Sequence, residues 1–151
     1  MTSEHLLHTI PPIYDGNSKI LILGSFPSVK SREVSFYYGH PQNRFWRVLA
    51  AVLGCAVPSS NEEKTALLQS HNIALWDVIK SCDIVGSSDS SIKNVVPNDI
   101  GVILSSCGIR QIYSNGKTSE KLFNKYIKDT VGRDTVALPS TSPANPSLNL
   151  E

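Results

Sequence analysis

The sequence predicts a three-layer α/β/α domain whose centre is a mostly parallel, four-stranded sheet. Short apolar runs that suit buried strands alternate with segments of helical periodicity. Loops rich in Gly, Ser and Pro separate them. A chain of 151 residues is long enough for one domain with its own core. With no internal repeat or linker in sight, we treat residues 1–151 as a single domain.

Four strands are expected. The first is KILILG at residues 19–24, a continuous apolar run ending in glycine, which is typical of a strand covered on both faces. The others are expected at residues 73–79, 109–116 and 135–138. Ligands of such sheets bind beyond the carboxyl ends of the strands. The loops GSFPS, SNGK and LPSTSPANPS fall there, so we expect the site at this edge.

Four helices are expected between and after these strands. Their apolar spacing or start signals place them at residues 43–53, 61–70, 98–106 and 117–127. Gly54 ends the first, Asn61 followed by two glutamates caps the second, and the pair Pro97–Asn98 begins the third. Residues 81–94, SCDIVGSSDSSIKN, are expected to form a polar loop.

Composition excludes several classes of protein. The net charge of +1 gives no global attraction to a polyanion, so any nucleic-acid site must be a local patch. Cys55, Cys82 and Cys107 lie far apart without a CxxC pair, which predicts free thiols rather than disulfides or a cysteine metal site. No apolar run approaches about 18 residues and the amino terminus has no leader pattern, so we expect a soluble intracellular protein.

One stretch, SFYYGHPQNRFWRVL at residues 35–49, combines aromatic rings with an amide and cations. Phe26, Tyr37 or Tyr38 could stack on a flat heterocycle. Asn43 offers a donor and an acceptor in one plane, suited to a base edge or a water molecule. Alternatively, Asn43 only caps its helix, and the rings of the NRFW motif belong to the core. His40 has either a chemical role or, as for most loop histidines, only solvent contacts.

Two further loops could bind a polar ligand. SNGK, residues 114–117, begins a helix whose free N–H groups suit an anion or a polar edge, and Asn115 could read a hydrogen-bonding pattern. The alternative is an ordinary Asn-Gly turn. LPSTSPANPS offers hydroxyl and N–H groups for phosphate contacts, or is simply a stiff surface loop. Pattern alone therefore predicts a site for a planar polar ligand and goes no further.

Five segments, in order across residues 20–147, give the chain a resemblance to a known family. They are ILGSFPS, FYYGHPQNRFW, ALWDV with GSSDSSI, SNGKTSEKLF, and LPSTSPANPS. The chain resembles the uracil-DNA glycosylase superfamily, and most closely its hypoxanthine (deoxyinosine) DNA glycosylase branch. The resemblance implies a monofunctional enzyme of base excision repair, which extrudes a deaminated base and hydrolyses its N-glycosidic bond without a metal or redox cofactor.

The resemblance also implies roles for single residues. The superfamily usually places a water-positioning Asp or Asn where this chain has Ser25–Phe26, so Asn43 is the candidate catalytic residue, holding the water through its side-chain carbonyl. Phe26 would stack on the base. The expected base contacts are Ser25, Phe26, Tyr38, His40 and Asn115. The expected DNA contacts are Ser28, Lys117, Ser140, Thr141, Ser142, Pro143, Ala144 and Asn145. Lys30, Arg32 or Arg44 could approach the backbone, unless Arg44 ties its helix to a loop.

The partner implied is DNA that contains a deaminated base. We expect a monomer with no membrane association, located in the cytoplasm or nucleoid, or in the nucleus of a eukaryote. A helix usually follows the last loop in such enzymes, and the chain ends at Glu151 before it. Three alternatives stay open: a uracil-preferring enzyme of the same fold, a catalytically silent DNA-binding module, and a small-ligand protein of flavodoxin-like build.

Overall fold

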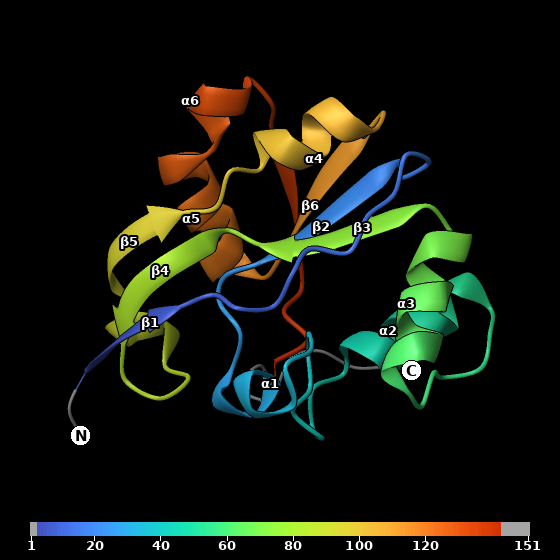
Figure 1. Cartoon of the computed structure of the whole chain (residues 1–151), viewed down its shortest axis with the longest axis horizontal. Coiled ribbons are helices and arrows are strands. Elements are labelled where there is room, and N and C mark those ends of the chain that lie inside the picture. The colour runs from blue at the N-terminus through green and yellow to red at the C-terminus, as the bar shows by residue number, and fades with distance from the viewer. Residues whose placement is uncertain (1–2, 143–151) are drawn as a thin grey trace.

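A four-stranded parallel sheet forms the centre of the fold (Figure 1). The computed structural model describes residues 3–142. The strand order is β3-β2-β6-β7, and all three pairings are parallel. The strands are β2 (Ile20–Gly24), β3 (Ile73–Asp77), β6 (Gln111–Asn115) and β7 (Thr135–Leu138). The four predicted strands and their parallel arrangement are confirmed, with ends that differ by at most two residues.

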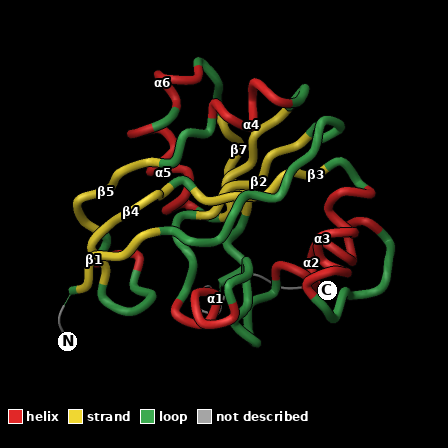
Figure 2. Tube along the Cα trace, in the orientation of Figure 1, coloured by secondary structure: helices red, strands yellow, loops and turns green. Residues whose placement is uncertain are grey.

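Helices cover both faces of this sheet, so the three-layer prediction is also confirmed (Figures 1 and 2). One face carries α4 (Gly101–Ser106), α5 (Lys117–Tyr126) and α6 (Lys128–Val131), and the other carries α2 (Phe45–Leu53) and α3 (Asn61–Ser70). Helix α1 (Val29–Val34) follows β2 and lies beyond the carboxyl ends of the strands (Figure 1). Side chains alternate along a strand. Leu21 and Leu23 therefore join the core beneath α4 and α5, while Ile22 joins the core beneath α2 and α3.

A second, antiparallel sheet lies beside the first and was not predicted. It consists of β1 (Glu4–Leu7), β4 (Ile79–Ile84) and β5 (Lys93–Pro97) in the order β1-β4-β5. The expected polar loop at residues 81–94 is therefore wrong at both ends, since residues 81–84 belong to β4 and residues 93–94 to β5. Only residues 85–92 connect strands, and they include a short 3-10 helix, η1 (Asp89–Ser91).

The second sheet escaped detection for two physical reasons. The pairing of β4 with β5 shifts register twice, between Ile79 and Ser81 and between Ser81 and Asp83. Each shift breaks the simple alternation of buried and exposed side chains from which a strand is recognised. In addition, β3 and β4 form one nearly continuous strand with only Val78 between them, so the chain passes from one sheet to the other without a turn signal.

Two predicted helix starts need correction. Helix α3 is capped by Ser60 rather than Asn61, because the Ser60 hydroxyl accepts the Glu63 N–H at 3.1 Å. Helix α4 begins at Gly101 rather than Asn98. The Asn98 side chain is buried and donates to the carbonyl oxygens of Asp77 and Ile79, at 2.9 and 3.1 Å. It therefore fastens the point where the strand crosses between the sheets.

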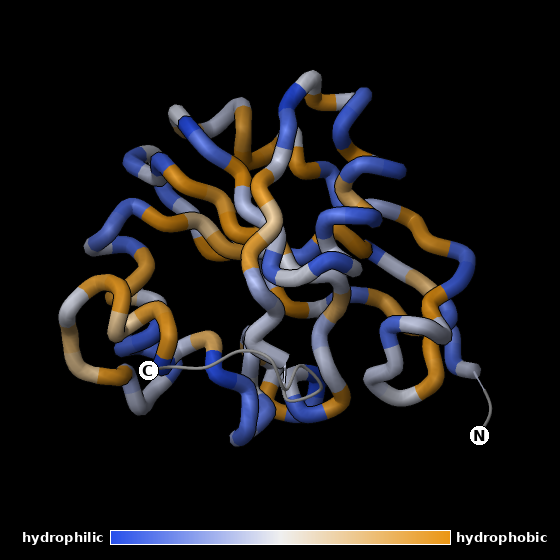
Figure 3. Tube along the Cα trace, turned by 180° about the vertical axis from the view of Figure 1, so that it is seen from behind, coloured by the Kyte–Doolittle hydropathy of each residue, from blue (hydrophilic) through white to orange (hydrophobic). Residues whose placement is uncertain are grey.

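The remaining helix predictions hold closely. Gly54 ends α2 in the left-handed conformation, with φ of 70°. Helix α2 begins at Phe45, two residues after the expected start. Hydrophobic residues follow the strands through the middle of the molecule, and hydrophilic ones gather on the outer helices and loops (Figure 3). Among the described residues, no helix has the length and apolar character that a membrane span requires.

Replacing Asn98 tests the junction between the sheets. Asn98→Ala leaves two buried carbonyl groups without a donor, which should lower the free energy of unfolding by about 2–4 kcal/mol. Urea unfolding followed by circular dichroism measures this change. The matched control is Asn124→Ala on the exposed face of α5, where we expect a change within about 0.5 kcal/mol. Equal stability of the two variants would contradict the role given to Asn98.

Candidate functional site

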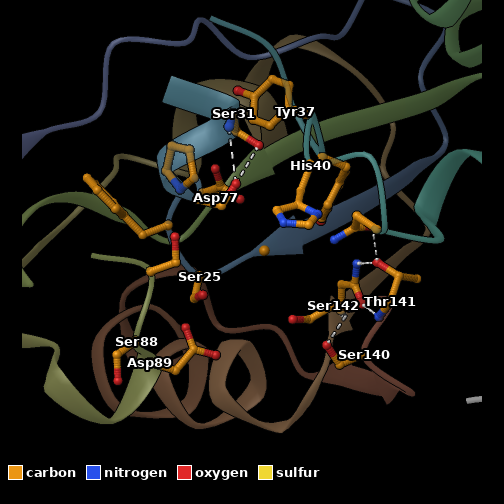
Figure 4. A pocket seen from close by; sticks show the side chains of 18 of the residues that line it. Ser25, Ser31, Tyr37, His40, Asp77, Ser88, Asp89, Ser140, Thr141 and Ser142 are labelled. Atoms are coloured by element: carbon orange, nitrogen blue, oxygen red, sulfur yellow. Dashed lines mark hydrogen bonds between the residues drawn. The ribbon is translucent and has the colours of Figure 1, made fainter. Parts of the chain in front are cut away.

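A pocket of about 520 Å³ opens at the carboxyl-terminal edge of the parallel sheet (Figure 4). The last residues of three neighbouring strands line it: Gly24 of β2, Asp77 of β3 and Asn115 of β6. The register explains this convergence, since Gly24 lies opposite Asp77, and Leu23 lies opposite Ser114. The volume falls within the ~300–1,000 Å³ typical of small-molecule sites. The predicted position of the site at this edge is thus where the structure has its pocket.

The pocket gathers every predicted site residue of the described chain except Lys117. Those that line it are Ser25, Phe26, Ser28, Tyr38, His40, Asn43, Asn115, Ser140, Thr141 and Ser142. Lys117 is the exposed first residue of α5 and lies outside the lining. Pro143, Ala144 and Asn145 lie outside the described residues. Sequence reasoning missed two carboxylates in the lining, Asp77 and Asp89.

Three of the predicted residues form one hydrogen-bonded network that joins three loops. The Thr141 hydroxyl donates to Asn43 Oδ1 at 2.9 Å and accepts from Asn115 Nδ2 at 3.0 Å. The Thr141 N–H also donates to Asn115 Oδ1 at 3.1 Å. These bonds fix both carboxamide planes relative to each other. The network therefore holds the NRFW, SNGK and proline-rich motifs in a single arrangement.

Asn43 has a structural role in addition to its place in the pocket. Its Oδ1 accepts the Phe45 N–H at 2.9 Å at the start of α2, as well as the Thr141 hydroxyl. A carboxamide oxygen has two lone pairs, and both are engaged. The carbonyl can therefore hold a water molecule only after the Thr141 hydroxyl has turned away. Asn43 therefore helps to cap α2, but this contact does not decide whether capping is its only role, and the catalytic role stays a prediction.

Phe26 is held rigidly at the pocket wall. Its ring packs against the core of the second sheet, formed by Ile79, Cys82 and Ile84. The guanidinium carbon of Arg32 lies 5.7 Å from the ring centroid. Arg32 also donates to the carbonyl oxygens of Pro27 and Gly86, at 3.0 and 3.2 Å. Because its donors bind these carbonyls, Arg32 serves to fix the Phe26 loop.

Tyr37 and Tyr38, which were expected to offer rings for stacking on a ligand, have different surroundings in the structure. Tyr37 is a core residue, only 2% exposed, whose hydroxyl contacts the carbonyl oxygens of Ile10 and Pro11. Tyr38 has a positive φ of 53°, an unusual backbone for a bulky residue. Its ring stacks on Phe45 with centroids 4.1 Å apart, and its buried hydroxyl has no hydrogen-bond partner in residues 3–142. The Tyr38 hydroxyl lies beside Gly24, where a β-carbon would be 3.0 Å from it, so it is close to Asp77 in the lining of the pocket.

Other predicted contacts prove to be caps and ties. The Ser28 hydroxyl caps α1 by accepting the Ser31 N–H at 3.1 Å. His40 Nδ1 accepts the Gln42 N–H at 3.0 Å, which leaves the Nε2–H of that ring as its donor. The Arg44 guanidinium donates to the Ser142 carbonyl at 2.7 Å, so the alternative that Arg44 ties its helix to the last loop is confirmed.

Asp77 is a buried carboxylate in the lining of the pocket. Its side chain is 5% exposed and its Oδ2 lies 2.7 Å from Nε2 of His8, whose side chain is 2% exposed. Gly24 is required beside it, because a β-carbon at that position would lie 2.4 Å from Asp77 Oδ1 and 3.0 Å from the Tyr38 hydroxyl. The sequence held a signal for Asp77: it is the lone carboxylate in the apolar strand IALWDVI.

Asp89, in η1, lies across the pocket from Asp77 (Figure 4). Asp89 is an exposed residue, but neighbouring groups displace water from part of its carboxyl group and raise its pKa, an effect that the hydroxyls of Thr118 and Ser25 partly oppose. Burial first, and the Asp77 carboxylate next, likewise raise the pKa of Tyr38. Groups whose pKa is shifted in this way gather at functional sites.

Comparison with known proteins gives a single family. Residues 11–149 match the family model described as the uracil DNA glycosylase superfamily. Two hypoxanthine DNA glycosylases, from Methanosarcina barkeri and Methanosarcina acetivorans, are each 36% identical over 137 residues, or 89% of this chain and 85% of theirs.

A solved structure agrees with these relatives. The solution NMR structure of a Methanosarcina acetivorans protein, provisionally assigned as a uracil DNA glycosylase, superposes with a TM-score of 0.80 at 35% identity. The match covers 93% of this chain and 89% of that one. The resemblance that the sequence motifs indicated is confirmed.

The raised pKa of Asp89 has a measurable effect on stability. A carboxyl group that binds its proton more tightly when folded stabilises the fold below its unfolded pKa, and this contribution is lost as pH rises through the folded pKa. Asp89→Asn, which resembles the protonated form, should therefore be more stable than the wild type at pH 7 and equal to it near pH 3. Urea unfolding at both pH values measures the difference.

Asp83 provides a control of opposite sign for this measurement. Hydrogen bonds from Asn94 and His5 hold the pKa of Asp83 below its usual range. That contribution is present above the unfolded pKa and is lost as pH falls through the folded pKa. Asp83→Asn should therefore be less stable than the wild type at pH 7. A loss of stability at pH 7 for Asp89→Asn as well would contradict the assignment.

Proposed function

Because the chain belongs to the uracil-DNA glycosylase superfamily, we propose that it is a DNA glycosylase that extrudes hypoxanthine from DNA and hydrolyses its N-glycosidic bond. The observation that carries this proposal is the convergence of the family's motifs on one preformed pocket. Its volume of about 520 Å³ suits a purine base, and its lining combines aromatic rings with amides, hydroxyls and two carboxylates. The relatives named hypoxanthine DNA glycosylases support the choice of base.

The pocket walls fit the energetics of base extrusion. Unstacking a base costs a few kcal/mol, least for a mispaired one. Stacking on an aromatic side chain returns roughly 1–3 kcal/mol per base. We assign this role to Phe26, because its ring is packed firmly at the pocket wall, whereas Tyr37 is buried and Phe45 covers one face of the Tyr38 ring. The packing of Phe26 against the second sheet means that it needs no reorganisation when the base arrives.

Bond cleavage places negative charge on the departing base and positive charge on the sugar. Fixed donors near the base oxygens and nitrogens stabilise that charge. The pocket offers the Nε2–H of His40, the second N–H of the Asn115 carboxamide and the Ser25 hydroxyl. We assign the positioning of the attacking water to Asn43, whose carbonyl becomes available when the Thr141 hydroxyl turns toward DNA. Because an amide is a poor base, this contribution is one of orientation.

The DNA backbone would meet the chain around Ser140, Thr141 and Ser142. These residues line the pocket, and hydrogen bonds hold their backbone in place: the Thr141 N–H donates to Asn115, and Arg44 donates to the Ser142 carbonyl. Small hydroxyl side chains and backbone N–H groups are common phosphate contacts. A monomeric state and a location in the compartment that holds the DNA stay predictions.

Asn43→Ala tests the proposed chemistry. Single-turnover release of base from a duplex containing deoxyinosine should fall roughly 100-fold or more, because the orienting group is lost at the reacting centre. Binding to the same duplex should change little. Ser60→Ala is the control, since it removes a helix cap of α3 remote from the pocket, at a cost of about 1 kcal/mol, and should leave cleavage intact.

Other outcomes of this experiment would point elsewhere. Parallel loss of cleavage, binding and thermal stability in Asn43→Ala would reduce the residue to a structural cap. Faster release from a deoxyuridine duplex by the wild type would make the enzyme a uracil-preferring member of the fold. No release from any duplex, with tight binding retained, would identify a catalytically silent DNA-binding module and refute the proposal.

A further inference from the structure

We propose that Asp77, held in position by His8, is the group that distinguishes a deaminated base from its parent, by accepting a hydrogen bond from the ring N–H of the extruded base. This inference rests on the proposed function, because it concerns the base bound in the same pocket. Asp77 would touch the substrate directly. His8 would act through Asp77 and is a positioning residue.

The two oxygens of Asp77 have different surroundings. Oδ2 lies 2.7 Å from His8 Nε2. Oδ1 accepts no hydrogen bond within residues 3–142 and lies against Gly24, itself part of the pocket lining. Since His8 does not line the pocket, the His8 side of the carboxylate points away from the cavity and the Oδ1 side faces it. One acceptor atom is therefore presented to a ligand at the inner end of the pocket.

His8 is fixed from several directions, so Asp77 cannot easily turn. The His8 backbone N–H donates to the Lys80 carbonyl at 2.7 Å, which ties the segment after β1 to β4. The ring meets Phe26 edge-on, with centroids 6.0 Å apart and planes at 80°, and lies 6.0 Å from the ring of Tyr37. The imidazole and carboxylate are both almost fully buried. The pair keeps one geometry, because if either side chain turned away, both buried groups would be left without this hydrogen bond.

Carboxylate chemistry supplies the selectivity. An ionised carboxylate only accepts hydrogen bonds. Deamination of adenine converts ring N1 from an acceptor into an N–H donor, and deamination of cytosine does the same at N3. A fixed acceptor at the inner end of the pocket therefore bonds to the deaminated ring, whereas it faces the lone pair of the parent ring. A site built around one hydrogen bond rejects the analogue that cannot make it, because buried polar groups are left unpaired.

The test compares two purines that differ at this ring nitrogen and at the C6 oxygen beside it, so the selectivity is interpreted only as a change between a variant and the wild type. Identical duplexes carry deoxyinosine, whose N1 bears a hydrogen, or deoxynebularine, whose N1 is an acceptor. Single-turnover rates of base release give a selectivity ratio for each protein. Intrinsic differences between the two leaving groups cancel when the ratio of a variant is divided by that of the wild type.

The variants separate the acceptor from its support. In Asp77→Asn, the amide oxygen can accept from His8 and its NH₂ group replaces Oδ1, so the selectivity for deoxyinosine should fall roughly tenfold or more. His8→Leu should lower the ratio in the same direction because Asp77 is released, whereas His8→Gln should keep it, since its amide can donate to Oδ2. His5→Leu is the matched control. His5 also pairs with an aspartate, Asp83, but this pair lies in the antiparallel sheet and outside the pocket lining, so the selectivity ratio should not change.

Several results would overturn the inference. A selectivity ratio in Asp77→Asn equal to that of the wild type would do so while leaving the proposed function intact. A wild type that releases neither base would refute both. If Asp77→Asn or His8→Leu does not fold, an NMR measurement on the wild type tests the inference instead. Free hypoxanthine should shift the ¹⁵N resonance of His8 Nε2, and 1-methylhypoxanthine, which lacks the N1–H, should not. Equal shifts would contradict the proposal.

Discussion

The fold depends on one strand that serves two sheets. Residues 73–84 run from the parallel sheet into the antiparallel one with only Val78 between β3 and β4. Asp77 sits at this crossing, Asn98 binds the carbonyl groups on either side of it, and His8 reaches it from beyond β1. The inner wall of the pocket is thus built where the two sheets join. The antiparallel sheet packs against Phe26 at the pocket wall, and its β4 fixes the backbone of His8, which lies behind Asp77.

The pocket is organised before any ligand arrives. Its amides are locked to each other through Thr141, its aromatic ring is packed against a core, and its inner carboxylate is held by a buried imidazole. Such preorganisation lowers the cost of ordering side chains on binding. The one adjustment the chemistry asks for is a rotation of the Thr141 hydroxyl, which would expose the Asn43 carbonyl. A hydroxyl rotation is a small motion compared with the movement of a loop.

Sequence periodicity was sufficient for the parallel sheet and for the location of the site. KILILG was predicted as a strand because it is a continuous apolar run, which the structure buries, and glycine and proline signals marked the ends of the strands. TVAL was predicted from its β-branched and apolar residues, although β7 is largely exposed. β4 and β5 could not be predicted. Their register shifts disrupt the alternation of buried and exposed side chains, and no turn separates β3 from β4. Tyr37 and Tyr38 look alike in sequence, yet one is core and the other stacks on Phe45. The role of Asp77 could not be predicted from the sequence, because it depends on a contact with His8, which is distant in the sequence.

A crystal structure of the protein bound to a duplex with 2′-fluoroarabino-deoxyinosine would show where the extruded base binds, because the fluorine slows cleavage and preserves the bound base. We expect hypoxanthine outside the helix, its ring parallel to Phe26 and its N1 within hydrogen-bond distance of Asp77 Oδ1. A base still stacked in the duplex would contradict the assignment of the pocket. A base inside the pocket with N1 turned toward Asn115 would contradict the role of Asp77.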